Sequence, residues 1–160
     1  MTTPRINIHA SCVVLERAGD IFGASRDAGV LIVGESGAGK SDLALRLIAM
    51  GAVLVADDRC DLFVSSDALR AAVPQAIAGL IEVRGVGIVR VPYRPDARIA
   101  LAVRLADESA IARLPEPGRY HPPPPLELPH ESLPREILLA PFEASAPAKV
   151  LAAAAEFARR

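Results

Sequence analysis

Eight consecutive residues, 34–41, constrain the fold of this chain more than any other part of its sequence. They read Gly-Glu-Ser-Gly-Ala-Gly-Lys-Ser, which matches the G-x-x-x-x-G-K-S pattern of a phosphate-binding P-loop. The glycines let the backbone curl until several N–H groups face one anion, and the following helix adds its dipole. Lys40 is expected to neutralise the β- and γ-phosphates of a nucleotide, and Ser41 to ligate Mg²⁺. The predicted nucleotide-binding residues are Gly34, Glu35, Ser36, Gly37, Ala38, Gly39, Lys40 and Ser41.

The segments on either side of this loop are those that a P-loop requires. Residues 30–33 read Val-Leu-Ile-Val, an apolar run typical of a strand that is covered on both faces. Residues 42–50 carry aliphatic side chains at helical spacing, and Gly51 is a natural helix end. The chain contains only two lysines, Lys40 and Lys149. With lysine so rare, a chance match to the lysine of the motif is improbable.

Further apolar segments predict a sheet of several strands. The expected strands are residues 6–15, 30–33, 53–56, 61–64, 99–105 and 137–139, with a strand–turn–strand unit over 80–89, a loop or hairpin over 16–29 and an apolar turn over 68–73. Residues 147–160 are rich in alanine and predict a C-terminal helix. The fold class is therefore α/β, a P-loop-containing mixed β-sheet with flanking helices, in a single domain over residues 1–160.

Prolines cluster between about residues 112 and 136, and residues 122–125 are four consecutive prolines. Such a run favours polyproline II and excludes a helix or a central strand. We expect an extended or mobile surface segment here.

Composition excludes several classes of function. The net charge is −1 and no basic stripe is present, which argues against a nucleic-acid-binding surface. Apolar runs are only as long as strands, and the N-terminus lacks a basic region followed by an apolar run, so neither a membrane span nor a signal peptide is expected. Two cysteines, Cys12 and Cys60, are expected to be reduced thiols of a cytoplasmic protein.

Two adjacent carboxylates, Asp57 and Asp58, follow the apolar segment 53–56. In P-loop proteins an aspartate that ends such a strand approaches Mg²⁺ and phosphate from beside the loop. One carboxylate can hold a metal-bound water while the other accepts a proton. The alternative is a solvated turn, in which aspartate is common.

Three further polar residues are ambiguous from the sequence alone. Glu82 and Arg84 lie two residues apart and share one face of a strand, where they order a metal-bound water and a phosphate oxygen or form an exposed ion pair worth about 0–1 kcal/mol. His9 is either a surface residue or a hydrogen-bond partner of a carboxylate.

Together these residues resemble the catalytic domain of the bifunctional HPr(Ser) kinase/phosphorylase family. The resemblance rests on residues 8–11 (Ile-His-Ala-Ser), the P-loop, residues 54–58 (Leu-Val-Ala-Asp-Asp) and residues 80–87 (Leu-Ile-Glu-Val-Arg-Gly-Val-Gly), and it covers roughly residues 6–105. It implies a sheet related to that of phosphoenolpyruvate carboxykinase. It also implies ATP and Mg²⁺ as cofactors, with inorganic phosphate and pyrophosphate as further ligands.

The family phosphorylates a serine of the phosphocarrier HPr and removes that phosphate with inorganic phosphate, releasing pyrophosphate. The resemblance makes Asp57 the base toward serine, with His9 contacting the aspartate pair, and it suggests Lys149 as a basic phosphate-contacting residue. By resemblance the catalytic residues are Asp57, His9 and Arg84, and the metal ligands are Ser41, Asp58 and Glu82.

The resemblance further implies an HPr-type substrate protein, a short form with the catalytic domain only, and a homo-oligomer, which is a hexamer in the family. Two alternatives of other classes remain open. One is a nucleotide-sensing module that binds without catalysing, against which the paired aspartates argue. The other is a small-molecule kinase, which an arginine-lined substrate pocket would favour.

Overall fold

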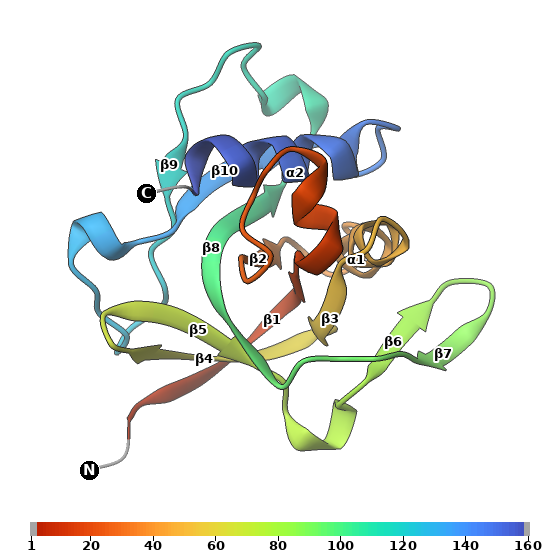
Figure 1. Ribbon diagram of the computed structural model, residues 1–160, viewed down its shortest axis with the longest axis horizontal. Coiled ribbons are helices and arrows are strands. Elements are labelled where there is room, and N and C mark those ends of the chain that lie inside the picture. The colour runs from red at the N-terminus through yellow and green to blue at the C-terminus, as the bar shows by residue number, and fades with distance from the viewer. Residues whose placement is uncertain (1–2, 159–160) are drawn as a thin grey trace.

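The computed structural model describes residues 3–158, which form one strongly bent, eight-stranded sheet with two α-helices packed on it (Figure 1). The strand order is β2-β1-β4-β5-β8-β10-β9, β3 pairs with β1, and β6 and β7 form a separate two-stranded sheet. The strands are β1 (Arg5–Val14), β2 (Gly29–Val33), β3 (Val53–Ala56), β4 (Arg59–Ser65), β5 (Ala68–Ala72), β6 (Leu80–Val83), β7 (Gly87–Arg90), β8 (Asp96–Leu105), β9 (Gly118–Arg119) and β10 (Arg135–Leu139). The α-helices are α1 (Lys40–Ala49) and α2 (Ala146–Phe157), and the 3₁₀ turns are η1 (Glu16–Ile21), η2 (Gln75–Ile77), η3 (Glu108–Ala110) and η4 (His130–Ser132).

Two ten-residue strands, β1 and β8, bend the sheet because each pairs with different partners along its length. The first half of β1 pairs antiparallel with β4, and its second half pairs antiparallel with β2 and β3. The start of β8 pairs antiparallel with β5, and its remainder runs parallel to β2 and β10. Since β2 pairs with both β1 and β8, five strands close a ring. The predicted mixed sheet is confirmed.

The bend divides the core into two aliphatic clusters. The larger lies between the sheet and the helices and includes Ile32, Leu47, Leu54, Leu101 and Leu151, all fully buried. The second fills the inside of the bend and includes the two cysteines, which are fully buried. Burial raises the pKa of both thiols, so they remain protonated at neutral pH.

Removing a core side chain from β8 is expected to destabilise the fold strongly. Leu101→Ala, at a fully buried position, should lower the free energy of unfolding by about 2–5 kcal/mol, because a cavity replaces its contacts. Urea denaturation followed by circular dichroism measures this change. Leu114→Ala is the matched control, since Leu114 is 89% exposed, and it should change stability by less than about 0.5 kcal/mol. Equal effects of the two variants would contradict the observed packing.

One predicted turn is wrong: residues 68–73 contain strand β5. Ser66 and Asp67 both have positive φ (52° and 56°) and make a two-residue hairpin loop that returns the chain beside β4. Leu69 and Ala71 are buried in the second cluster, whereas Arg70 between them is half-buried and pairs with Asp96. The apolar run over residues 68–72 is short and is interrupted by an arginine, so the sequence alone did not predict a strand. This strand pairs with β8, which is distant in the sequence.

The proline-rich segment is largely irregular, with a turn at residues 124–125 and the 3₁₀ turn η4, and three of its apolar side chains are buried. Tyr120, Leu126 and Leu133 are each 5–6% exposed, and β9, the end strand of the sheet, pairs antiparallel with β10. The number of prolines indicates the conformation that the backbone prefers, but it does not predict which side chains of the segment are buried.

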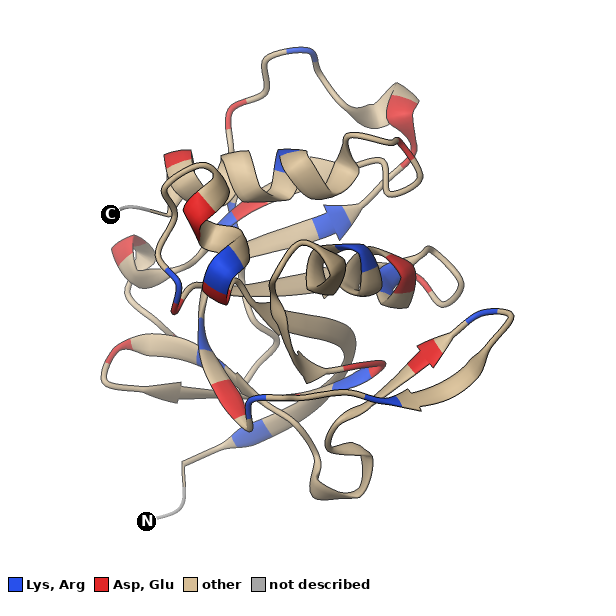
Figure 2. Cartoon of the chain, turned by 45° about the vertical axis from the view of Figure 1, so that its right-hand side comes forward, with Lys and Arg blue, Asp and Glu red and all other residues tan. Residues whose placement is uncertain are grey.

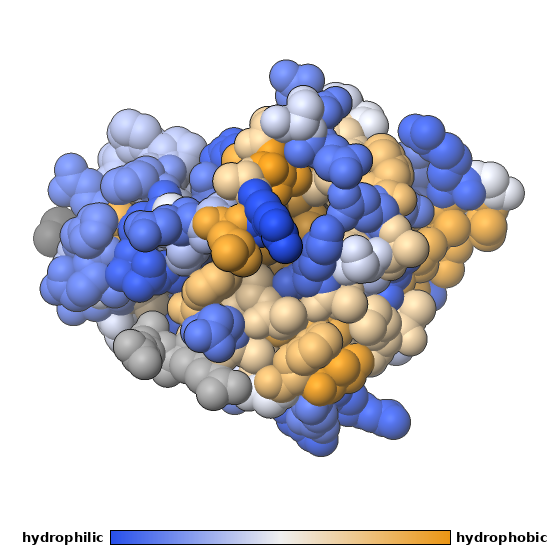
Figure 3. Space-filling view, turned by 90° about the horizontal axis from the view of Figure 1, so that it is seen from above, coloured by the Kyte–Doolittle hydropathy of each residue, from blue (hydrophilic) through white to orange (hydrophobic). Residues whose placement is uncertain are grey.

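The surface of the described residues carries mixed charge. Acidic and basic residues are scattered along the chain in Figure 2, and neither sign gathers on one element. Figure 3 shows hydrophobic patches interrupted by hydrophilic side chains on the face seen from above. Within residues 3–158, neither helix has the length and apolar character needed to cross a bilayer.

Candidate phosphate-binding site

The P-loop joins the buried strand β2 to helix α1, as predicted. Gly39 adopts a φ of 106°, and a Cβ atom built on it would lie 2.9 Å from the Phe142 ring, so only glycine fits there without strain. Lys40 is 7% exposed, and its Nζ donates to the carbonyls of Gly34 (2.8 Å) and Glu35 (2.9 Å). These bonds hold the ammonium group against the loop that is expected to wrap a phosphate.

Asp57 is buried beside the loop, with 5% exposure. Its Oδ1 accepts hydrogen bonds from Ser41 Oγ (2.7 Å) and Ser11 Oγ (2.9 Å), and its Oδ2 accepts one from the Glu82 backbone N–H (3.0 Å). Within residues 3–158 no lysine, arginine or histidine forms an ion pair with it. A buried carboxylate held only by neutral donors attracts a cation.

Asp58 points in another direction because its backbone adopts a φ of 71°. Its side chain is 71% exposed, and Oδ1 lies 3.8 Å from Nδ1 of His9. Its N–H donates to Ser11 Oγ at 3.4 Å, a long bond that ties the turn to β1. The two neighbouring carboxylates therefore differ in access: one is enclosed at the loop, and the other faces solvent.

The hairpin β6–β7 supplies the remaining polar residues. Ile81 is fully buried and anchors β6, which places Glu82, Val83 and Arg84 around the outer part of the site. A cavity of about 370 Å³ lies between the loop and this hairpin. It is lined by His9, Ser36, Gly37, Gly39, Lys40, Ser41, Asp42, Leu45, Asp58, Glu82, Val83, Arg84 and Phe142.

The donor set fits Mg²⁺. Hydroxyl and carboxylate oxygens of Ser41, Asp57, Asp58 and Glu82 belong to this region, and they are the hard ligands that magnesium prefers. The described residues contain no tight cluster of three metal-ligating His, Cys, Asp or Glu side chains. That arrangement suits an ion that keeps several waters and is completed by substrate phosphates.

Most of the residues predicted from sequence are thus brought together. Lys149 is the exception: it does not line the cavity, and its Nζ lies 2.5 Å from Glu143 Oε2. The expectation that Lys149 contacts phosphate is therefore not supported, because its charge is already paired.

Sequence reasoning missed two residues of the site. Ser11 is fully buried and bonds to Asp57; its signal was a polar residue two positions after His9 within an apolar strand. Phe142 lines the cavity although it is 72% exposed. Its only signal in the sequence was its being an aromatic residue in a chain with 4% aromatic residues.

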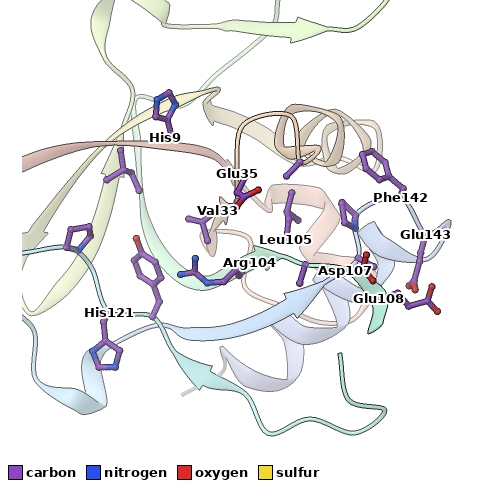
Figure 4. A pocket seen from close by; sticks show the side chains of 18 residues that line it. His9, Val33, Glu35, Arg104, Leu105, Asp107, Glu108, His121, Phe142 and Glu143 are labelled. Carbon is purple, nitrogen blue, oxygen red and sulfur yellow. The ribbon is translucent and has the colours of Figure 1, made fainter. Parts of the chain in front are cut away.

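A second, larger cavity of about 1070 Å³ adjoins the loop on its other side (Figure 4). It lies where the parallel strands β2, β8 and β10 end, the edge of an α/β sheet at which ligands commonly bind. Gly34, Glu35 and Ala38 of the loop line this cavity, while His9 and Phe142 line both cavities.

Comparisons with known proteins agree with this geometry. Residues 4–110 match the family model described as "HPr Serine kinase C-terminal domain". An HPr kinase/phosphorylase of Leptothrix cholodnii is 41% identical over 102 residues, which cover 59% of this chain and 31% of that protein. One from Thermoanaerobacter sp. is 44% identical over 87 residues, or 54% of this chain and 25% of that protein. The chain thus spans between a quarter and a third of these curated relatives.

A solved structure extends the similarity to the fold. The HPr(Ser) kinase/phosphatase from Coxiella burnetii superposes with a TM-score of 0.68 at 25% identity, over 91% of both chains. The family model covers the P-loop, the aspartate pair and the hairpin, which are the elements that build the smaller cavity. By sequence, fold and the residues gathered at the loop, this chain belongs to the family of HPr serine kinase C-terminal domains.

Proposed function

We propose that this chain carries the phosphoryl-transfer site of an ATP- and Mg²⁺-dependent protein kinase that phosphorylates a serine of an HPr-type phosphocarrier in the cytoplasm. The observation that carries the proposal is the divergent aspartate pair beside the P-loop. A phosphate cradle, an enclosed carboxylate bonded to Ser41 and a solvent-facing carboxylate at one cavity meet the needs of transfer to a hydroxyl. The relatives named HPr kinase/phosphorylase support the choice of substrate.

We assign the two aspartates in the reverse of the order expected from sequence. Asp57 is bonded to Ser41, the residue that a P-loop uses toward Mg²⁺, and its oxygens already accept three hydrogen bonds, so it suits the metal side. Asp58 is exposed and lines the cavity, so an incoming serine can reach it. Asp58 is therefore the proposed base, and Asp57 the proposed metal-side carboxylate.

The other residues of the site neutralise the charge of the phosphates and orient the proposed base. Ser41, Asp57 and Glu82 would hold Mg²⁺, which when bound would offset the negative charge of the phosphates. Lys40 and the loop N–H groups hold the β- and γ-phosphates, and Arg84 lines the cavity where it can meet phosphoryl oxygens. His9, whose Nδ1 lies 3.8 Å from Oδ1 of Asp58, is placed to donate a hydrogen bond to that carboxylate and orient it.

The same residues suit the reverse reaction, which we include in the proposal. Inorganic phosphate would occupy the loop and attack the phosphoserine phosphorus, giving pyrophosphate and free serine. The carboxyl group that accepted the serine proton returns it in this direction, as microscopic reversibility requires. The hexameric assembly implied by the resemblance stays a prediction.

Incubation with γ-labelled ATP, Mg²⁺ and a purified HPr-type protein tests the proposed function. We expect label on a serine of the carrier, and no label on a carrier whose target serine is replaced by alanine. Omitting Mg²⁺ with EDTA should abolish transfer, because the triphosphate charge is then not neutralised. Tight nucleotide binding without transfer to any carrier would instead favour a nucleotide-sensing module.

A further inference from the structure

The two cavities beside the P-loop differ in their charged groups. The smaller is lined by the carboxylates of Asp42, Asp58 and Glu82, but it also contains Lys40, Arg84 and the loop N–H groups, which suit phosphates. The larger contains the carboxylates of Glu35, Asp107, Glu108 and Glu143 (Figure 4).

The positive groups of the larger cavity do not balance these carboxylates. Its arginine, Arg104, already pairs with Glu136 at 3.1 Å, and Glu143 pairs with Lys149 at 2.5 Å, which leaves Glu35, Asp107 and Glu108 without an ion-pair partner among residues 3–158. Asp107 accepts hydrogen bonds from the N–H and hydroxyl of Ser109, which lower its pKa and keep it ionised near neutral pH. This cavity disfavours a phosphate and favours a neutral group that donates hydrogen bonds, such as a ribose hydroxyl or an exocyclic amine.

Phe142 stands at the junction of the two cavities. It lines both, is 72% exposed, and lies close over Gly39 of the P-loop. An aromatic ring so exposed adds little to the core, but its face is available to a flat ligand.

The loop that carries Phe142 is fixed to helix α1. Arg46 of that helix donates to the carbonyls of Pro141 and Glu143, the latter at 3.3 Å, and it also pairs with Asp42 at 3.0 Å. The backbone on either side of Phe142 is therefore held in place relative to the phosphate cradle. An aromatic residue on a backbone that is fixed before binding loses little conformational entropy when a ligand stacks on it.

We propose that the junction of these cavities binds the nucleoside of the nucleotide, with the base stacked on Phe142 and the ribose hydroxyls directed toward the carboxylates of the larger cavity. This inference rests on the proposed function only for the position of the phosphates. It adds a nucleoside-binding residue that lies outside the P-loop, the aspartate pair and the hairpin. The aromatic contact does not read the base edge, so different purines should bind with similar affinity.

Isothermal titration calorimetry with Mg·ATP and with Mg·tripolyphosphate separates the nucleoside from the phosphates. Phe142→Ala should weaken ATP binding by roughly 5- to 100-fold, the range of an aromatic–base stack, and change tripolyphosphate binding by less than about twofold. Phe142→Tyr should retain the wild-type affinity for ATP. Phe142→Leu keeps bulk against Gly39 without an aromatic face, so it should behave like the alanine variant toward ATP.

Phe22→Ala is the matched control, since Phe22 is 45% exposed and lines neither cavity. If Phe142→Ala weakened the binding of ATP and of tripolyphosphate equally, the ring would act only on the conformation of the loop. If ATP binding were unchanged, the base would bind elsewhere. A variant that alters only the KM for the carrier protein would make Phe142 a protein-docking residue. Each of these results overturns the inference, whereas failure of the wild-type chain to bind either ligand would overturn the proposed function itself.

Discussion

Asp58→Asn is expected to reduce serine phosphorylation by roughly 10²–10⁴-fold, the usual contribution of a positioned base. The amide cannot accept the serine proton, but it keeps the size of the side chain. Because the side chain is 71% exposed, folding should be unaffected. The affinity for Mg·ATP should change by less than about twofold, since we assign the metal side to the neighbouring carboxylate. Single-turnover kinetics and calorimetry measure the two quantities separately.

Asp57→Asn is the informative comparison. It should shift the Mg²⁺ dependence of transfer to higher concentrations, because it removes the enclosed charge bonded to Ser41. If Asp57→Asn abolished transfer with unchanged Mg²⁺ dependence while Asp58→Asn remained active, the order expected from sequence would be right and our assignment wrong.

Lys40→Met is expected to weaken ATP binding by roughly 10- to 150-fold, since charge-assisted bonds to phosphate contribute about 1.5–3 kcal/mol. Transfer should fall further, by about 10²–10³-fold, because charge develops on the phosphoryl oxygens in the transition state. Methionine keeps the stem of this buried side chain, and thermal unfolding should confirm that the variant folds.

Lys149→Met is the matched control, because it removes the chain's other lysine. That lysine pairs with Glu143 outside the smaller cavity, so the variant should bind ATP within about twofold of wild type. Equal losses in both variants would indicate a general effect of positive charge rather than a specific phosphate contact.

Local sequence patterns predicted the elements around the loop. The apolar run before Gly34, the helical spacing after Lys40 and the glycine-rich turn of the hairpin each encode one element by short-range rules. Strand β5 was missed because its pairing with β4 and β8, rather than its own residues, makes it a strand. The ring closure between β2 and β8 joins residues about seventy positions apart and has no local signal.

The candidate site was predictable where a motif fixes the backbone. The P-loop, the aspartate pair and Glu82 were identified from residue order: Asp58 and Glu82 line one cavity with the loop, and Asp57 bonds to Ser41 and to the Glu82 N–H beside it. The difference between Asp57 and Asp58 was not predictable, because it depends on one positive φ and on a buried serine from another strand. Phe142 arrives from the far end of the chain, and its position over the loop follows from the arginine of α1 that fixes its own loop.

The hairpin β6–β7 is the part of the site with the weakest support. It is a two-stranded sheet outside the main one (Figure 1), and such ribbons are marginally stable alone. Ile81 and the bond from the Glu82 N–H to Asp57 attach it to the body of the protein. Local opening of this ribbon would remove Glu82 and Arg84 from the cavity and expose Asp57 to water in a single event. Activity should therefore be lost under mild denaturation while the eight-stranded sheet is still folded.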